Sequence, residues 1–369
     1  MKEKIENLNS INWNGLSCFE RSLCYASMHF VPSSWIAFLL LKMDFRNSFF
    51  AETKYAIGSD KYYHDLLGFL GLDFEWHYCF EKDFYADINH DVTNGFEIVL
   101  CANTFDIDGT KDFKNKNHPH FIFINQLMDK GTEIIDEDWT KEYWNKENSK
   151  TELIYLKKYV EYGKLKDYCR CFYKCNRGME QDKFCYIRVY STMPNHPNAF
   201  AIIDEYAKGI KSMLNMEQAF SMQNLNAIKN FYNTFQAYTD VFSSIEEKKQ
   251  IKSINQGSKL NRFSLKNKYI YPGDLDVIGC HHFFLDAQNQ ALKIIFKLDF
   301  LDSLPGKTLN RLLDDYNLVK IFIAKDLYDK KPDHKDFLIK HLDEISKSEL
   351  FFYKEILKMI EKTEIKFDD

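Results

Sequence analysis

The sequence lacks the features that mark membrane-spanning, secreted and nucleic-acid-binding proteins. Its longest apolar run, Trp35 to Leu41, is far shorter than the ~20 residues that span a bilayer. The first residues, Met1 to Asn7, are too polar for a secretion signal. The 49 basic residues are balanced by 54 acidic ones, and they form no concentrated stripe of the kind that binds nucleic acid. We therefore expect a cytoplasmic protein whose partners include neither a membrane nor a nucleic acid.

Phosphate-binding and zinc-binding motifs are also missing. No G-x-x-x-x-G-K loop is present, so we expect no requirement for ATP. One group of cysteines resembles a zinc site, but its spacing matches no standard pattern: Cys169, Cys171, Cys175 and Cys185. We interpret these cysteines as alternating side chains on half-buried strands. His281 and His282 are adjacent in a predicted helix, where neighbouring side chains point apart. We therefore predict no metal site and no bound cofactor.

A segment near the start of the chain carries the strongest chemical signal. Small and polar residues lead into Cys18, and the apolar positions after it have helical spacing as far as about Phe30. Ser17 is suited to cap this helix. The unpaired N–H groups at a helix N-terminus favour a thiolate, and Arg21 adds positive charge nearby. The alternative is that Cys18 is an ordinary core cysteine, as we expect for Cys24 inside the same helix.

A predicted β-hairpin supplies two further groups. Two strand-like runs flank a turn at Asp129–Gly131. His120 lies where the first strand begins and Asp136 where the second ends, so antiparallel pairing brings them together. With the Cys18 thiol they form a nucleophile, a base and an orienting carboxylate. His118 competes with His120 for the role of base, and the proline between them lets only one point inward. The alternative is a coincidence of core residues.

Other parts of the chain show helix and strand patterns. We predict helices over residues 35–44 and 59–70 and strands over 74–80 and 97–104. A polar loop, 106–117, precedes the hairpin and should border the cleft. The region after Asn198 has helix-period apolar positions in five segments: 199–222, 227–243, 276–300, 308–327 and 334–361.

The N-terminal part, residues 10–145, resembles the butirosin biosynthesis protein H N-terminal family. That family is related to papain-like and bacteriocin-processing cysteine peptidases. The resemblance rests on five short stretches: Ser17-Cys18, Leu66–Leu72, Phe96–Cys101, His118–Ile124 and Ile134–Asp136.

The resemblance implies an acyltransferase of natural-product, nonribosomal-peptide-like biosynthesis. Members of the family take an acyl group from the phosphopantetheine thioester of an acyl or peptidyl carrier protein and deliver it to an amine. The catalytic residues would be Cys18, His120 and Asp136. The partners would be a carrier protein and a small amine or diamine.

Two assignments around this site are less direct. Papain-like enzymes use a Gln before the Cys to stabilise the oxyanion, and none is present here. We expect the Cys18 N–H and a side-chain amide, Asn12 or Asn14, to take that role. In the loop before His118, Asp106 or Asp108 would bind the distal ammonium of a diamine.

The chain has 369 residues, which is enough for two domains. Of these residues, 45% are hydrophobic and 16% aromatic. We predict an α+β fold: a papain-like core with an antiparallel sheet and an N-terminal nucleophile helix over residues 10–150. Connecting strands would occupy 151–195, and a mostly helical domain that completes the substrate cleft would occupy 196–369. Two other functions remain open. One is a peptidase or amidase that uses the same triad with water, and the other is a non-catalytic interaction protein in which Cys18 only packs.

Overall fold

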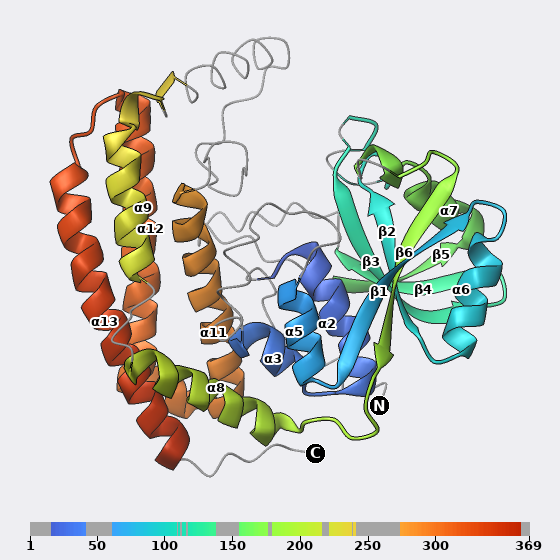
Figure 1. Ribbon diagram of the computed structural model, residues 1–369, viewed down its shortest axis with the longest axis horizontal. Coiled ribbons are helices and arrows are strands. Elements are labelled where there is room, and N and C mark those ends of the chain that lie inside the picture. The colour runs from blue at the N-terminus through green and yellow to red at the C-terminus, as the bar shows by residue number, and fades with distance from the viewer. Residues whose placement is uncertain are drawn as a thin grey trace. The chain divides into compact units, whose positions relative to one another are not determined.

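The protein is an α+β structure, seen in a computed structural model (Figure 1). The model describes residues 16–41, 61–108, 110, 113–115, 117–137, 155–175, 179–215, 221–237, 239–240 and 274–362. The chain divides into two compact units, Met1–Tyr206 and Ala207–Asp369. In the described residues no helix is both long enough and apolar enough to cross a membrane.

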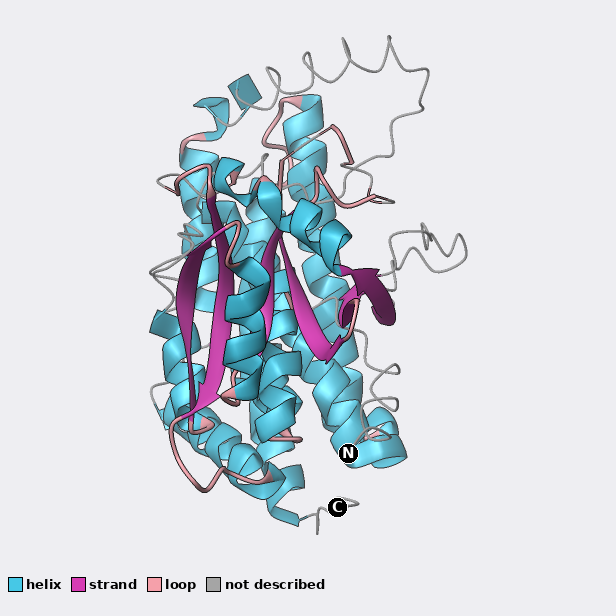
Figure 2. Cartoon of the chain, turned by 90° about the vertical axis from the view of Figure 1, so that its right-hand side faces the viewer, coloured by secondary structure: helices cyan, strands magenta, loops and turns pink. Residues whose placement is uncertain are grey.

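The first unit is built on a six-stranded sheet in which every neighbouring pair is antiparallel. The strand order is β1-β6-β2-β3-β4-β5. The strands are β1 (Leu72–Phe80), β2 (Glu97–Asn103), β3 (Pro119–Met128), β4 (Gly131–Glu137), β5 (Tyr155–Glu161) and β6 (Lys183–Ser191). Figure 2 shows them in magenta, viewed from the right-hand side of Figure 1. The predicted strands over 74–80 and 97–104 and the predicted hairpin are confirmed.

Helices cover both faces of this sheet (Figure 1). One face carries α2 (Cys18–Phe30) and α5 (Lys61–Phe69), and α3 (Ser34–Leu40) packs against α2. The other carries α6 (Phe84–Thr93) and α7 (Tyr162–Arg170). Because the sheet is covered on both sides, its central strand β2 is buried at every position from Ile98 to Asn103.

Aromatic rings fix α2 on its face of the sheet. The ring of Phe19 packs edge-on against Phe74 of β1 and Phe121 of β3, with centroids 6.1 and 4.9 Å away. It also meets Tyr63 of α5 at 4.8 Å. These contacts hold the first turn of α2 beside the start of β3, since aromatic pairs bury large apolar areas.

Residues 155–191 differ from what the sequence predicted. We expected the segment 151–195 to connect two domains, yet it supplies β5 and the interior strand β6. The interpretation of the cysteine group as strand residues is confirmed for Cys185, which lies in β6, and is wrong for the other three: Cys169 lies in α7, and Cys171 and Cys175 flank the short 3₁₀ helix η4 (Phe172–Lys174). Helix α6 was not predicted.

The second unit is helical, as the sequence indicated. Helix α8 (Ala199–Asn215) begins in the first unit and ends in the second. The described residues after it form four further helices: α9 (Ser221–Asn233), α11 (Asp274–Asp302), α12 (Leu304–Asp329) and α13 (Lys335–Lys362). Helix α9 contacts α11 and α13, and α12 contacts the same two helices. The four therefore pack as a closed group around a shared core.

That helical core contains buried polar pairs. His281 Nε2 lies 2.9 Å from the Glu349 carboxylate, and the Tyr316 hydroxyl lies 3.3 Å from His281 Nδ1. All three side chains are buried. The adjacent His282 has its pKa lowered to about 3, mainly by burial. It lies partly exposed on α11, as expected for a neighbour that points away from His281.

Candidate active site

Cys18 is the first residue of α2. Ser17 is the N-cap: its Oγ accepts a hydrogen bond from the Glu20 N–H at 3.3 Å, and the Glu20 carboxylate accepts one from the Ser17 N–H at 2.6 Å. This reciprocal capping box fixes where the helix begins. Arg21 Nε donates to the Ser17 carbonyl at 3.2 Å, so a guanidinium lies against the same first turn. Cys18 therefore lies at the positive end of a well-capped helix.

A hydrogen bond between α2 and β3 holds Cys18 close to the hairpin. The buried Ser22 hydroxyl, one turn after Cys18, donates to the Phe121 carbonyl at 2.9 Å. Phe121 directly follows His120 on β3. The Ser22–Phe121 hydrogen bond therefore fixes the position of Cys18 relative to His120, in addition to the ring packing of Phe19.

The hairpin brings His120 and Asp136 into contact. Phe123 pairs with Ile135, and the register shifts at a bulge between Ile124 and Gln126. His120 Nε2 lies 2.7 Å from Asp136 Oδ1, and each side chain is only 3% exposed. The juxtaposition predicted from the hairpin is confirmed, and the carboxylate is placed to hold the imidazole in one orientation.

Cys18 is the third member of the group and interacts with the same imidazole. Burial by itself lowers the pKa of His120, but the charge and hydrogen bond of Asp136, together with those of Cys18, raise it well above its ordinary value. The imidazolium form is therefore favoured beside the sulfur. Cys18 is partly exposed, whereas the histidine and the carboxylate are buried. The arrangement leaves the sulfur of Cys18 accessible to solvent and keeps the imidazole and the carboxylate buried.

The other described thiols have different surroundings. Burial raises the pKa of six of them: Cys24, Cys79, Cys101, Cys169, Cys171 and Cys175. A raised pKa keeps a thiol neutral and weakly nucleophilic. Cys24, on the same helix as Cys18, is fully buried and has its pKa raised by burial and then by Glu20. The prediction that Cys24 is an ordinary core cysteine is confirmed.

His118 lies close to the site, but its backbone has a separate role. Its carbonyl accepts a hydrogen bond from the Thr104 N–H at 3.0 Å, which closes the loop that follows β2. Its side chain is half-buried, whereas that of His120 is buried against Asp136. Of the two candidate bases, the structure pairs His120 with the carboxylate.

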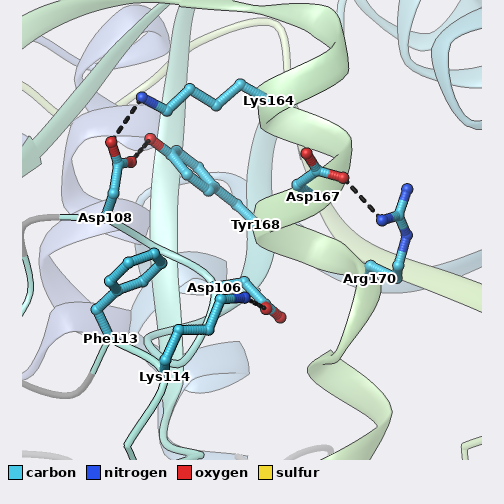
Figure 3. A pocket seen from close by; sticks show the side chains of 8 residues that line it. All are labelled: Asp106, Asp108, Phe113, Lys114, Lys164, Asp167, Tyr168 and Arg170. Atoms are coloured by element: carbon cyan, nitrogen blue, oxygen red, sulfur yellow. Dashed lines mark hydrogen bonds and ion pairs between the residues drawn. The ribbon is translucent and has the colours of Figure 1, made fainter.

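Asp106 and Asp108 line one pocket of about 400 Å³ between the loop after β2 and helix α7 (Figure 3). Asp108 accepts from Lys164 Nζ at 2.8 Å and from the Tyr168 hydroxyl at 2.9 Å. The hydrogen bond from Lys164 is the main reason that the pKa of Asp108 is lowered. Asp106 pairs with Lys114 at 3.0 Å. Each carboxylate thus already holds one ammonium group.

Sequence reasoning missed several residues that position this region. Asn103, at the end of β2, donates to the Asn117 side chain and the Cys171 carbonyl, and it accepts from the Phe105 N–H. Tyr168 reaches Asp108 from α7 and also lies near enough to Asp136 to sense its charge. These residues lie far apart in the sequence, so no local sequence pattern predicts that they are in contact.

The predicted oxyanion-hole residues, Asn12 and Asn14, lie outside the described residues. The chain matches no protein-family model and no curated protein.

Proposed function

We propose that the protein is a cysteine-dependent acyltransferase that forms amides. Cys18 takes an acyl group from the phosphopantetheine thioester of a carrier protein and passes it to a small amine. The observation that carries this proposal is the contact of three groups from separate elements: the Cys18 thiol at a helix N-terminus, the buried His120 and the buried Asp136. This is the relation of nucleophile, base and orienting group that covalent catalysis requires.

The reaction takes place in two balanced steps. In the first, the Cys18 thiolate attacks the thioester carbonyl, the bond to the carrier's sulfur breaks, and the leaving thiolate takes the proton of the His120 imidazolium. In the second, the amine attacks the acyl-Cys18 thioester, His120 accepts the amine proton, and the Cys18 thiolate leaves. The products are an amide and the free carrier thiol. Neither step needs ATP, because one thioester exchanges for another and aminolysis is downhill.

The finer statement of the fold is also a proposal: a papain-like core. In its favour are the chain order of cysteine, histidine and carboxylate, the nucleophile at the start of the first described helix, and the histidine on an antiparallel sheet. The resemblance to the butirosin biosynthesis protein H N-terminal family points the same way. We keep the reducing cytoplasm as the compartment, since all eight described cysteines are free thiols.

The pocket of Figure 3 is our proposed site for the acceptor amine. An ammonium group of a diamine would replace that of Lys164 on Asp108 or that of Lys114 on Asp106. Because one ammonium group replaces another, each carboxylate keeps a positively charged partner. The near nitrogen of the diamine would remain to lose its proton to His120. The oxyanion contact is proposed for the Cys18 N–H with Asn12 or Asn14.

The test separates transfer from hydrolysis. An acyl thioester of pantetheine or of a carrier protein is supplied with and without a short diamine, and amide and free acid are followed together. We expect amide to dominate when the amine is present and little free acid when it is absent. Equal release of free acid in both mixtures identifies a peptidase-like hydrolase instead. No turnover, with Cys18 unmodified, identifies a non-catalytic protein.

A further inference from the structure

A second group of ligand-type side chains lies on the face of the sheet opposite α2. His77 and Cys79 are two residues apart on β1, so they project to the same side of that strand. The His77 ring packs on Tyr186 at 4.7 Å, in the core that α6 and α7 cover. Asp87, in the first turn of α6, faces them. By contrast, Phe74 and Trp76 of the same strand face Phe19 of α2.

The three potential ligand atoms converge. One imidazole nitrogen, one thiol sulfur and one carboxylate oxygen all lie within 4.8 Å of one another. His77 Nε2 and Asp87 Oδ2 are 3.5 Å apart. A tetrahedral ion with bonds of about 2.0–2.3 Å holds its ligand atoms roughly 3.3–3.6 Å apart. The nitrogen and oxygen already have that spacing, and a small rotation of the Cys79 side chain brings the sulfur to it.

A second observation marks this place as incomplete. His77 Nε2 is buried, and among the described residues it has no hydrogen-bond partner, because the contact with Asp87 lacks hydrogen-bond geometry. Buried polar atoms in folded proteins nearly always have a partner. The contact of the ring with Tyr186 keeps the imidazole beside Cys79 and Asp87.

We propose that His77, Cys79 and Asp87 bind a divalent transition-metal ion of the zinc class. Nitrogen, thiolate and carboxylate ligands together suit a borderline-soft ion of this kind and not Mg²⁺ or Ca²⁺, which prefer oxygen alone. The Cys79 thiol gives up its proton to solvent when the ion binds. The His77 and Asp87 side chains are 23% and 36% exposed, so water can complete the coordination. The ion joins the edge strand β1 to helix α6, on the face of the sheet away from α2.

The test uses the full chain, stripped of metal with a chelator and titrated with Co²⁺ and then Zn²⁺. We expect one equivalent of Co²⁺ to give a thiolate charge-transfer band that Zn²⁺ abolishes. Cys79→Ser removes the band, and His77→Gln and Asp87→Asn each weaken Zn²⁺ binding at least about tenfold. Zn²⁺ at about a hundredfold excess over its dissociation constant raises the thermal midpoint by about 5 °C in the parent chain and not in Asp87→Asn.

Matched variants make the result specific. His64→Gln removes the imidazole of another His–carboxylate pair, His64 with Asp73, which has no thiol beside it. Cys171→Ser removes a partly exposed thiol elsewhere. We expect both variants to keep the parent's cobalt band. Cys18→Ala should also keep it, so this test is independent of the proposed acyl transfer.

Loss of the band in Cys171→Ser with retention in Cys79→Ser would overturn the assignment. So would the absence of any bound equivalent of Co²⁺ in the correctly folded parent chain. Because Cys79 is buried, Asp87→Asn at a partly exposed position serves as the variant least disturbing to folding.

Discussion

A histidine and a carboxylate are buried together in each of the two units, but their surroundings differ. In the first unit His120 lies 2.7 Å from Asp136, and in the second His281 lies 2.9 Å from Glu349. The remaining side of His281 is met by the Tyr316 hydroxyl, a neutral group of the helical core. The second partner of His120 is a partly exposed thiol, Cys18, at a helix N-terminus.

The comparison shows that a buried histidine–carboxylate pair does not by itself indicate catalysis. Both pairs are buried and have short nitrogen–oxygen distances, so each carboxylate holds its imidazole in one orientation. Within the part of the chain whose side chains the structure describes, only the first has a nucleophile that a substrate can reach. The second links α11, α12 and α13 and has the form of a structural network, whose value lies in leaving no buried polar group unsatisfied.

The largest expected effect comes from removing the nucleophile. Cys18→Ala should lower acyl transfer by about 10⁴-fold or more, because no covalent intermediate can form. Cys24→Ala is the matched control on the same helix and should retain the activity of the folded protein. Steady-state rates with a thioester and an amine measure both. Equal losses in the two variants would mean that α2 matters only for packing.

The orienting carboxylate should come next. Asp136→Asn should slow acyl transfer by about 10³- to 10⁴-fold, because the amide favours the wrong tautomer of His120. Glu349→Gln makes the same change in the helical pair and should leave the rate per folded molecule unaltered. A similar fall in both variants would erase the distinction between the two pairs.

The helical pair should instead control stability. His281→Leu leaves Glu349 buried without its partner and should lower the free energy of unfolding of the helical unit by about 3–5 kcal/mol. Denaturant titration followed by circular dichroism measures this. The double variant His281→Leu/Glu349→Leu should recover part of the loss, since it also removes the buried carboxyl group. A single variant as stable as the parent would show that the pair carries no structural energy.

The raised pKa of His120 predicts a pH dependence. Because the folded pKa lies above the ordinary value of about 6.5, the stability that the pair contributes is fully present below that pH. It is lost as the pH rises through the raised folded value. Acylation of Cys18 should likewise persist above pH 6.5 and decline only at more alkaline pH, tenfold per unit. In Asp136→Asn the decline should move to lower pH. An unchanged profile would mean that the carboxylate does not hold the proton on His120.

We expect the smallest effect from removing the hydrogen bond between helix α2 and strand β3. Ser22→Ala removes the bond to the Phe121 carbonyl and should reduce the acylation rate about three- to tenfold through a small misplacement of Cys18. Ser27→Ala removes a bond to Leu23 within the same helix and should leave the rate unchanged. Identical rates in both variants would show that ring packing alone positions the helix.

The parts of this fold that could be predicted from the sequence depend on neighbours in the chain. The start of α2 follows from Ser17 and Glu20, a local cap, and the His120–Asp136 contact follows from a short hairpin. The central place of β6 depends on pairing with β1 and β2, strands some 80 to 120 residues earlier, which no local pattern reveals. Cys169 in α7 and the two cysteines that flank η4 were predicted wrongly as strand residues, because alternation and a short helical turn look alike over seven residues.

The candidate site divides in the same way. Its three reactive groups were predictable because each has a local signature, a capped helix start or a strand end. Asp108, by contrast, is hydrogen-bonded to Lys164 and Tyr168, which come from a helix more than fifty residues later in the chain. The hydrogen bonds of that carboxylate could therefore be found only in the structure.

Intact-mass spectrometry after mixing the protein with an acyl thioester tests the central claim most directly. The account predicts that the mass rises by one acyl group, that peptide mapping places the group on Cys18, and that adding an amine removes it as amide. Cys18→Ala should show no adduct. A parent protein that stays unmodified, or an adduct on another cysteine that persists in Cys18→Ala, would contradict the account.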